Sequence, residues 1–192
     1  MPIRLCTAVL TLALAAPALA AADTLDIDPA HTHASFVIKH LLISNVRGEF
    51  RKTSGKLVYD EADPTKSTVE AVIDATTVDT REQKRDEHLR SPDFFDTAKY
   101  PTITFKSTKV EKAGDGKLKV TGDLTLRGVT KPVVLDVSGP TQEIKDPKGT
   151  PRRGVSVTGK INRRDFGVSY GPPAVLGDDV TIEIETELIK KS

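Results

Sequence analysis

Long stretches of alternating apolar and polar residues fill this chain from Lys117 onward and restrict it to an all-β fold. In Val180–Leu188 the alternation is almost complete, with aliphatic residues on one parity and Thr or Glu on the other. A period of two places alternate side chains on opposite faces of a pleated strand, so each strand has one apolar face and one polar face. Such faces are buried either by stacking two sheets or by closing one sheet into a barrel.

Two of the expected strands are unusually long. Thr102–Lys112 and Asp179–Lys190 would each extend roughly 35–40 Å at about 3.3 Å per residue. A tall, narrow barrel with an aliphatic interior suits a long hydrocarbon better than a compact polar metabolite. The alternative is an interior filled completely by side chains, and the alternation alone favours neither.

The rest of the chain is expected to be mostly strand, with one helix. The remaining strands are expected at Thr24–Asp28, Ala34–His40, Val46–Arg51, Gly55–Tyr59, Thr68–Ala75, Lys117–Leu126, Thr130–Ser138 and Arg153–Asn162. Pro29–Ala30 predicts a turn, and Gly48 suggests a bulge or tight bend. A polar helix is predicted over Thr80–Arg90, with Asp79 as N-cap and Leu89 holding it over one end of the barrel.

The first 22 residues have the features of a secretory signal peptide. Arg4 precedes the apolar run Leu5–Leu14, and small residues around Ala20 offer cleavage sites. The single cysteine, Cys6, lies inside this segment, so the mature chain would contain no disulfide. We expect one domain over residues 23–192, exported to the periplasm, with no second apolar stretch long enough to cross a membrane.

The charge of the mature chain is balanced. Without Arg4 it carries 27 basic and 27 acidic side chains, which argues against general nucleic-acid binding and against general anionic-membrane binding, because both need a basic excess. The basic residues of the helix, Arg81, Lys84, Arg85 and Arg90, are interspersed with acidic ones, so a solvated helix face is favoured over a phosphate site. Arg163-Arg164-Asp165 is interpreted as a bend with a local ion pair.

Motifs for metal binding and catalysis are weak. His31 and His33 would point to one side of a strand, but no sequence feature brings His40 or His88 to them as further ligands, so no metal site is expected. There is no nucleophile elbow, no downstream cysteine and no zinc-protease motif. The acidic residues fall on the polar parity of strands, where carboxylates are solvated and ordinary. We therefore expect neither an enzyme nor a cofactor.

Five segments together resemble the YceI family of exported lipocalin-like proteins. They are Ile27-Asp28 with His31–His40 (HTHASFVIKH), Asn45–Phe50 (NVRGEF), Arg85–Pro101 (RDEHLRSPDFFDTAKYP), Gly122–Leu135 (GDLTLRGVTKPVVL) and Ile161–Val168 (INRRDFGV). The resemblance covers essentially the whole mature chain. It implies an extended, eight-stranded antiparallel barrel, with one short helix capping an end, that holds a polyisoprenoid, an isoprenoid quinone or a similar amphiphile.

Under this interpretation the inward parity predicts the ligand contacts. The expected tail contacts are Phe36, Ile38, Phe105, Leu124, Leu135, Val157 and Ile184, with Phe94 or Phe95 at a mouth and His40 as polar contact. A plain core plug is an equal alternative for the two adjacent phenylalanines. The competing function is a ligand-free, stress-related interaction module that partners a membrane redox protein. A homodimer is compatible with the balanced charge.

Overall fold

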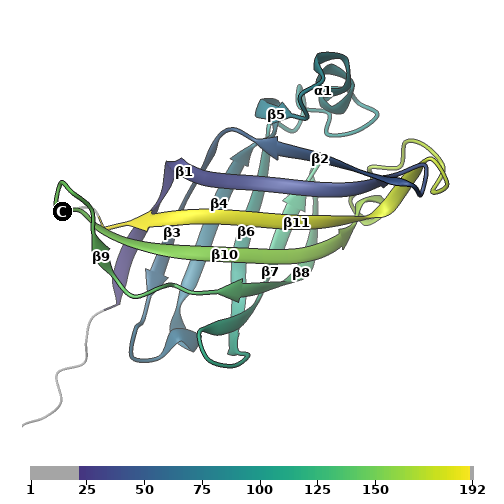
Figure 1. Cartoon of the computed structure of the whole chain (residues 1–192). Helices are drawn as coiled ribbons and strands as arrows, with labels where there is room; N and C mark the ends of the chain where they lie inside the picture. Colours follow the sequence, from purple (N-terminus) through teal and green to yellow (C-terminus); the bar gives the residue numbers. More distant parts are fainter. Residues whose placement is uncertain (1–21, 191–192) are drawn as a thin grey trace, which may run out of the picture.

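The computed structural model describes residues 22–190, which form a closed barrel of eight antiparallel strands (Figure 1). The predicted fold class is confirmed. In their order around the wall, the barrel strands are β1 (Asp23–His40), β3 (Thr53–Tyr59), β4 (Thr68–Asp74), β6 (Thr102–Lys112), β7 (Lys117–Leu126), β8 (Val129–Ser138), β10 (Pro151–Asn162) and β11 (Leu176–Ile189). β11 pairs back onto β1 from Asp26–Ile189 to His40–Leu176, and this pairing closes the barrel. Apart from its last residue, the signal peptide expected over residues 1–22 lies outside the described residues.

Short elements extend the wall and cover one end. β2 (Ser44–Phe50) pairs with the second half of β1, while β3 pairs with its first four residues. β2 therefore continues the wall where β3 stops. The remaining elements are β5 (Val78–Asp79), β9 (Ile144–Lys145), the helix α1 (Gln83–Arg90) and the 3-10 helices η1 (Pro64–Lys66), η2 (Ala75–Thr77) and η3 (Arg163–Phe166). Figure 1 shows α1 outside the strands, beside β5.

The turn predicted at Pro29–Ala30 is wrong, because β1 is a single strand of 18 residues. Its register with β11 shifts between Ile27 and Thr32, which marks a bulge. The side chain of Asp28 accepts the N–H of Ala30, and the Thr32 hydroxyl donates to the backbone oxygen of Asp28. These local bonds replace the lost ladder bonds, so the strand bends without ending.

Helix α1 begins three residues later than predicted, and Glu82 rather than Asp79 is its N-cap. The Glu82 carboxylate accepts the N–H groups of Lys84 and Arg85, which are first-turn donors without a helical partner. Arg81 has a positive φ of 63°, which is incompatible with an earlier start.

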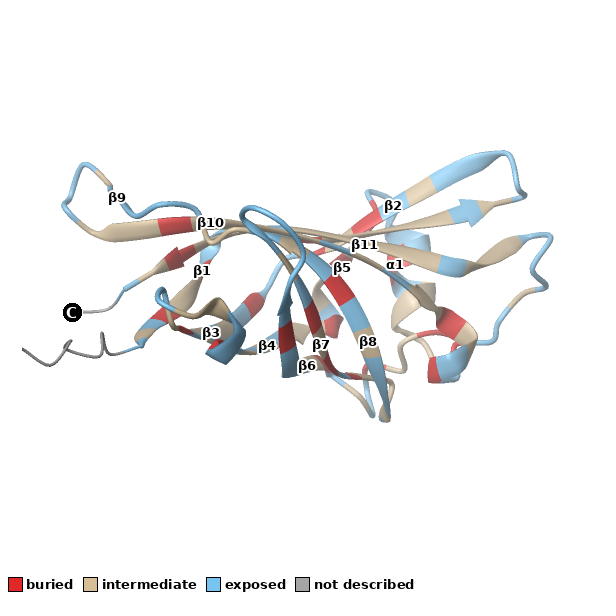
Figure 2. Cartoon of the chain, turned by 90° about the horizontal axis from the view of Figure 1, so that it is seen from below, coloured by how far each residue is buried: buried red, intermediate tan, exposed pale blue. Residues whose placement is uncertain are grey.

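The inward face keeps the alternation of the sequence almost everywhere, and Figure 2 shows buried residues recurring at intervals along the strands. Besides the bulge in β1, β6 is an exception, since its register with β7 shifts between Ser107 and Lys109. This bulge places Ile103, Phe105 and Val110 on the cavity side although their spacing breaks the period of two.

Two buried apolar clusters lie at opposite ends of the barrel. The smaller one consists of Leu25, Tyr59 and Leu188. The larger one lies at the end covered by α1. Its residue Ile103 pairs with Ile73 near the end of β4, whereas Tyr59 of the smaller cluster lies close to the start of β4. Its members are Phe50, Ala75, Val78, Phe94, Ile103, Leu124, Leu126, Phe166 and Val168. Within residues 22–190, no helix has the length and apolar character needed to cross a membrane.

Candidate functional site

A cavity of about 500 Å³ runs through the barrel and is lined almost entirely by apolar side chains. All eight barrel strands contribute to it, because each turns its apolar parity inward. On β11 the lining extends from Leu176 to Leu188, about 40 Å of strand at 3.3 Å per residue. The volume lies within the range of about 300–1,000 Å³ that is typical of small-molecule sites. The space is long and apolar, which suits a hydrocarbon chain.

The structure places every residue of the predicted ligand set on this one cavity. They are Phe36, Ile38, His40, Phe94, Phe95, Phe105, Leu124, Leu135, Val157 and Ile184. Their contact with a ligand stays a prediction. The convergence of the eight residues that lie on strands follows from the period of two, which fixes the inward parity of each strand independently, while Phe94 and Phe95 come from the irregular segment after α1.

Aromatic rings gather where α1 covers the barrel. Phe95 packs edge-on against Phe36 and Phe50, with centroid distances of 6.4 and 5.5 Å. Phe94 instead contacts His88 and Tyr170, at 5.0 and 5.2 Å. The two adjacent phenylalanines thus join different groups, and both line the cavity.

Two inward-facing glycines leave room for aromatic rings. A Cβ at Gly48 would overlap the ring of Phe36, and a Cβ at Gly122 would overlap the ring of Phe105. The bulge predicted at Gly48 is wrong, since Gly48 pairs in regular register with Phe36. Glycine is needed there because a ring from the neighbouring strand lies across it.

A cluster of hydrogen-bonded polar side chains lies at the cavity wall beside α1. The Arg85 side chain donates to the Thr80 hydroxyl at 2.7 Å and to the Thr80 carbonyl at 2.8 Å. Buried Asp86 accepts from the same hydroxyl at 2.6 Å. Thr80 and Arg85 line the cavity, while Arg85 is also exposed to solvent, as predicted for the basic residues of this helix.

Arg163 has a structural role that the sequence interpretation missed. Its side chain is buried, and it donates to the carbonyl oxygens of Val168, Tyr170 and Leu176 at 2.8–3.0 Å. Its acidic partner is Asp178 at 3.1 Å, so the predicted local ion pair with Asp165 is wrong. Burial lowers the pKa of Arg163, with a further contribution from the adjacent charge of Arg164. Nothing in the local pattern signalled this, because the accepting carbonyls come from a loop.

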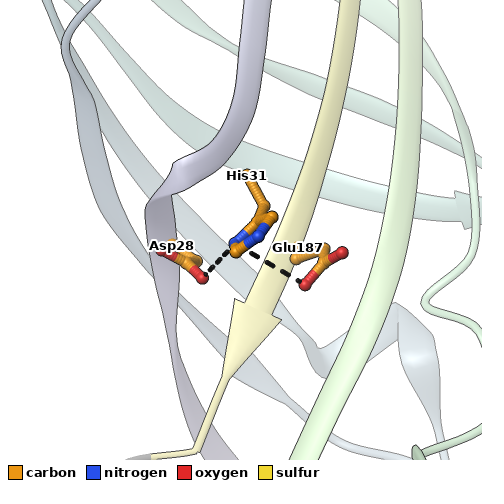
Figure 3. A group of neighbouring side chains, drawn as sticks. All are labelled: Asp28, His31 and Glu187. Atoms are coloured by element: carbon orange, nitrogen blue, oxygen red, sulfur yellow. Dashed lines mark hydrogen bonds and ion pairs between the residues drawn. The ribbon is translucent and has the colours of Figure 1, made fainter. Parts of the chain in front are cut away.

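A second polar cluster lies where β1 bends (Figure 3). Asp28 lies 2.8 Å from the Nδ1 atom of His31. Asp28 and Glu187 both accept from Arg152, at 2.7 and 2.8 Å. The hydrogen bond from Arg152, followed by that from His31, lowers the pKa of Asp28 to about 2. The expectation that carboxylates on the strands would be solvated and ordinary is wrong for Asp28, which is buried and paired.

Ligand atoms of Asp28, His31 and Glu187 lie within 4.8 Å of one another, close enough for a metal ion. The guanidinium of Arg152 already contacts both carboxylates, so their charge is compensated by this chain itself. His33 instead faces Glu49, at 3.9 Å, and the two histidines of the motif therefore have different partners. We interpret this cluster as an ion-pair network that ties β1 to β10 and β11.

Comparisons with known proteins agree with this geometry. Residues 25–188 match the family model described as YceI-like domain. Protein YceI of Escherichia coli O157:H7 is 43% identical over 172 residues, which cover 89% of each chain. The crystal structure of a Campylobacter jejuni YCEI protein is 39% identical, with a TM-score of 0.72 over 80% of this chain and 90% of that one. A polyisoprenoid binding domain from Saccharophagus degradans shares the fold, with 18% identity and a TM-score of 0.63 over 88% of this chain and 99% of the other.

Proposed function

Because the chain belongs to the YceI-like family, we propose that it is a binding protein that carries or stores a long-chain isoprenoid, such as a polyprenyl chain or an isoprenoid quinone, inside its barrel. The long apolar cavity is the observation that carries this proposal. The shared fold of the polyisoprenoid binding domain from Saccharophagus degradans supports the ligand class.

Desolvation supplies the binding free energy. Each methylene that leaves water contributes about 0.8 kcal/mol, so a long chain is held without a strong polar contact. Phe36, Phe105 and Ile184 are proposed to contact the tail, with the other predicted aliphatic residues of the lining. His40 is proposed to contact a polar end of the ligand, because its neighbours on the same face are apolar and it also lines the cavity.

We place this activity in the periplasm, in line with the signal peptide expected over residues 1–22. The role is binding without turnover. Thr80 and Arg85 on the lining are engaged with each other and with Asp86, and the aliphatic remainder of the surface gives a substrate no reacting group.

The decisive experiment identifies the cargo. The mature protein is purified from its native compartment without detergent, extracted with organic solvent, and the extract is analysed by mass spectrometry. One isoprenoid per barrel is the expected result. An empty extract, together with no uptake of added ubiquinone or polyprenyl phosphate, would favour the ligand-free interaction module.

Phe105→Asp tests the inward assignment directly. A carboxylate within the apolar lining must be desolvated by the bound tail, so binding of the same isoprenoid should fall by at least about tenfold. Phe105→Leu is the matched control, since it keeps the site apolar and should bind within a few-fold of the parent. Circular dichroism verifies that both variants are folded. Full binding by a folded Phe105→Asp protein would contradict the assignment.

A further inference from the structure

Five exposed apolar side chains surround one end of the barrel, and we name them the apolar rim. Leu41, Leu42 and Ile43 form the tip of the β1–β2 hairpin and are 48%, 67% and 82% exposed. Tyr170 and Val175, from the connection between η3 and β11, are 48% and 41% exposed. The N–H of Leu41 donates to the carbonyl of Val175 at 2.8 Å, which joins the two segments. Figure 1 shows both at the end of the barrel opposite β9.

The cavity reaches the surface at this rim. Tyr170 and Val175 both line the cavity, and they are the only large exposed apolar residues of the described chain that do so. His40 and Val46, at the base of the hairpin, belong to the same lining. A ligand that leaves the barrel between these residues passes directly across the rim.

A packed cluster occupies the opposite end. Leu25, Tyr59 and Leu188 are buried together there, and the guanidinium of Arg153 lies 5.3 Å from the centre of the Tyr59 ring. Arg153 also donates to Glu61 at 3.0 Å. A packed cluster beneath an ion pair is a poor exit for a hydrocarbon, which leaves the rim as the opening.

The rim is held in place with its apolar side chains outward. Arg163 and Arg164 bind carbonyl oxygens of the 168–176 segment from the inside, including that of Gly171 at 3.3 and 2.7 Å. Leu41 and Leu42 have positive φ angles of 52° and 60°. Leucine rarely adopts this conformation, so the hairpin tip accepts a backbone cost while its side chains stay in water.

Although the charge of the whole chain is balanced, the two segments that form the rim contain no acidic residue. Segments 39–48 and 167–177 contain Lys39 and Arg47 but no Asp or Glu. Asp178 and Asp179, which follow the second segment directly, are paired with basic side chains. Lys39 is exposed next to the hairpin tip, while Arg47 pairs with Glu183 on β11. Basic residues beside a shallow apolar surface are the combination that anionic phospholipids attract.

From these observations we infer that the apolar rim docks on an anionic phospholipid bilayer, so that the ligand passes between membrane and barrel at this end. The inference deepens the proposed function, on which the transfer step rests. Docking itself depends only on the rim. The apolar side chains enter the interface, and Lys39 stays at the level of the phosphates.

Vesicle co-sedimentation tests the docking. The mature protein is mixed with vesicles of three parts phosphatidylethanolamine to one part phosphatidylglycerol, and with vesicles of phosphatidylcholine alone. We expect binding to the anionic vesicles and at least about a tenfold loss of it in Leu42→Ser/Ile43→Ser, because several buried carbons are removed. Lys39→Glu should weaken binding to the anionic vesicles and leave phosphatidylcholine unaffected.

The matched control is Val134→Ser/Ile144→Ser. These side chains are similarly exposed, at 51% and 65%, but Val134 lies on the outer face of β8 and Ile144 on β9, at the other end. The control should bind vesicles like the parent. Equal binding by the rim variant and the control would overturn the inference. So would a parent dimer, seen by sedimentation velocity, that the rim substitutions dissociate, since a second copy would then cover the rim.

A separate measurement distinguishes failure of docking from failure of ligand binding. Uptake of ubiquinone-2 from vesicle-free solution should be the same in the parent and in Leu42→Ser/Ile43→Ser, because neither residue lines the cavity. No uptake by either protein, with rim-dependent vesicle binding intact, would reject the proposed function and keep the docking. Normal uptake with no vesicle binding by the parent would reject the docking alone.

Discussion

At the scale of single residues, the shape of the cavity depends on where side chains are absent. Gly48 and Gly122 occupy inward positions on β2 and β7, where the alternation would otherwise place a side chain. The rings of Phe36 and Phe105 lie across these gaps instead of extending fully into the barrel. Each glycine therefore keeps a ring against the wall and the cavity open.

Gly48→Ala should destabilise the protein by about 1–3 kcal/mol, because the new methyl group displaces the Phe36 ring from a packed position. Urea unfolding of the single variant, of Phe36→Leu and of the double variant measures the coupling. A smaller residue at 36 should relieve most of the clash, so the double variant should be more stable than the sum of the single effects predicts. Strict additivity would show that the ring does not set the constraint.

At the scale of elements, the buried side chain of Arg163 fixes the path of the segment between η3 and β11. The connection between η3 and β11 contains Gly167, Gly171 and two prolines, a composition that forms few backbone bonds of its own. Arg163 supplies donors to five carbonyl oxygens of residues 168–177. The order of this segment therefore comes from a side chain outside it.

Arg163→Met should cost about 3 kcal/mol or more of unfolding free energy, because several buried carbonyls lose their donor. Hydrogen exchange should rise selectively over residues 167–177. Arg47→Met is the control, since Arg47 is exposed and its bond to Glu183 has little net value. Unchanged exchange over that segment in Arg163→Met would contradict the assigned role.

Strand boundaries follow the sequence where packing alternates simply. β6 and β7 begin and end at the residues predicted, Thr102–Lys112 and Lys117–Leu126. β1 does not, because Pro29 and Ala30 signal a turn while the bonds made by Asp28 sustain the strand through a bulge. Local propensity cannot show that the lost ladder bonds are replaced by a side chain.

The residues of the candidate site were likewise predictable only in part. The lining was predictable, since the inward parity of each strand is a local property and closure of the barrel brings the strands together. The roles of Arg85 and Arg163 were not predictable, because their acceptors lie in irregular segments whose path depends on the finished barrel.

At the scale of the whole molecule, the ion-pair network beside the β1 bulge joins the first barrel strand to the last two. Arg152 on β10 bridges Asp28 on β1 and Glu187 on β11, and it also donates to Asp146 at 3.0 Å. The three strands meet where the barrel closes. Protonation of Asp28 should therefore weaken the closure.

Asp28→Asn should lower the unfolding free energy at neutral pH by about 2 kcal/mol, the equivalent of a pKa lowered from 3.8 to about 2. The folded-state pKa is below the unfolded value, so this stabilisation is complete above about pH 4 and is lost as the pH falls toward 2. Urea unfolding across this range should show the parent and the variant converging in acid. A constant difference at every pH would indicate a packing effect instead.

Because the barrel is closed by its first and last strands, β1 and β11, the barrel can close only after β11 is available. β1 leads the described chain and β11 comes last, so the wall stays open until nearly all of the sequence is available. A barrel that lacks β11 is not closed, so its apolar lining would be exposed to water. A chain that ends before Leu176 would form an open sheet with an exposed apolar face, which favours aggregation. Whether the lining is shielded from water therefore depends on the pairing of the last strand.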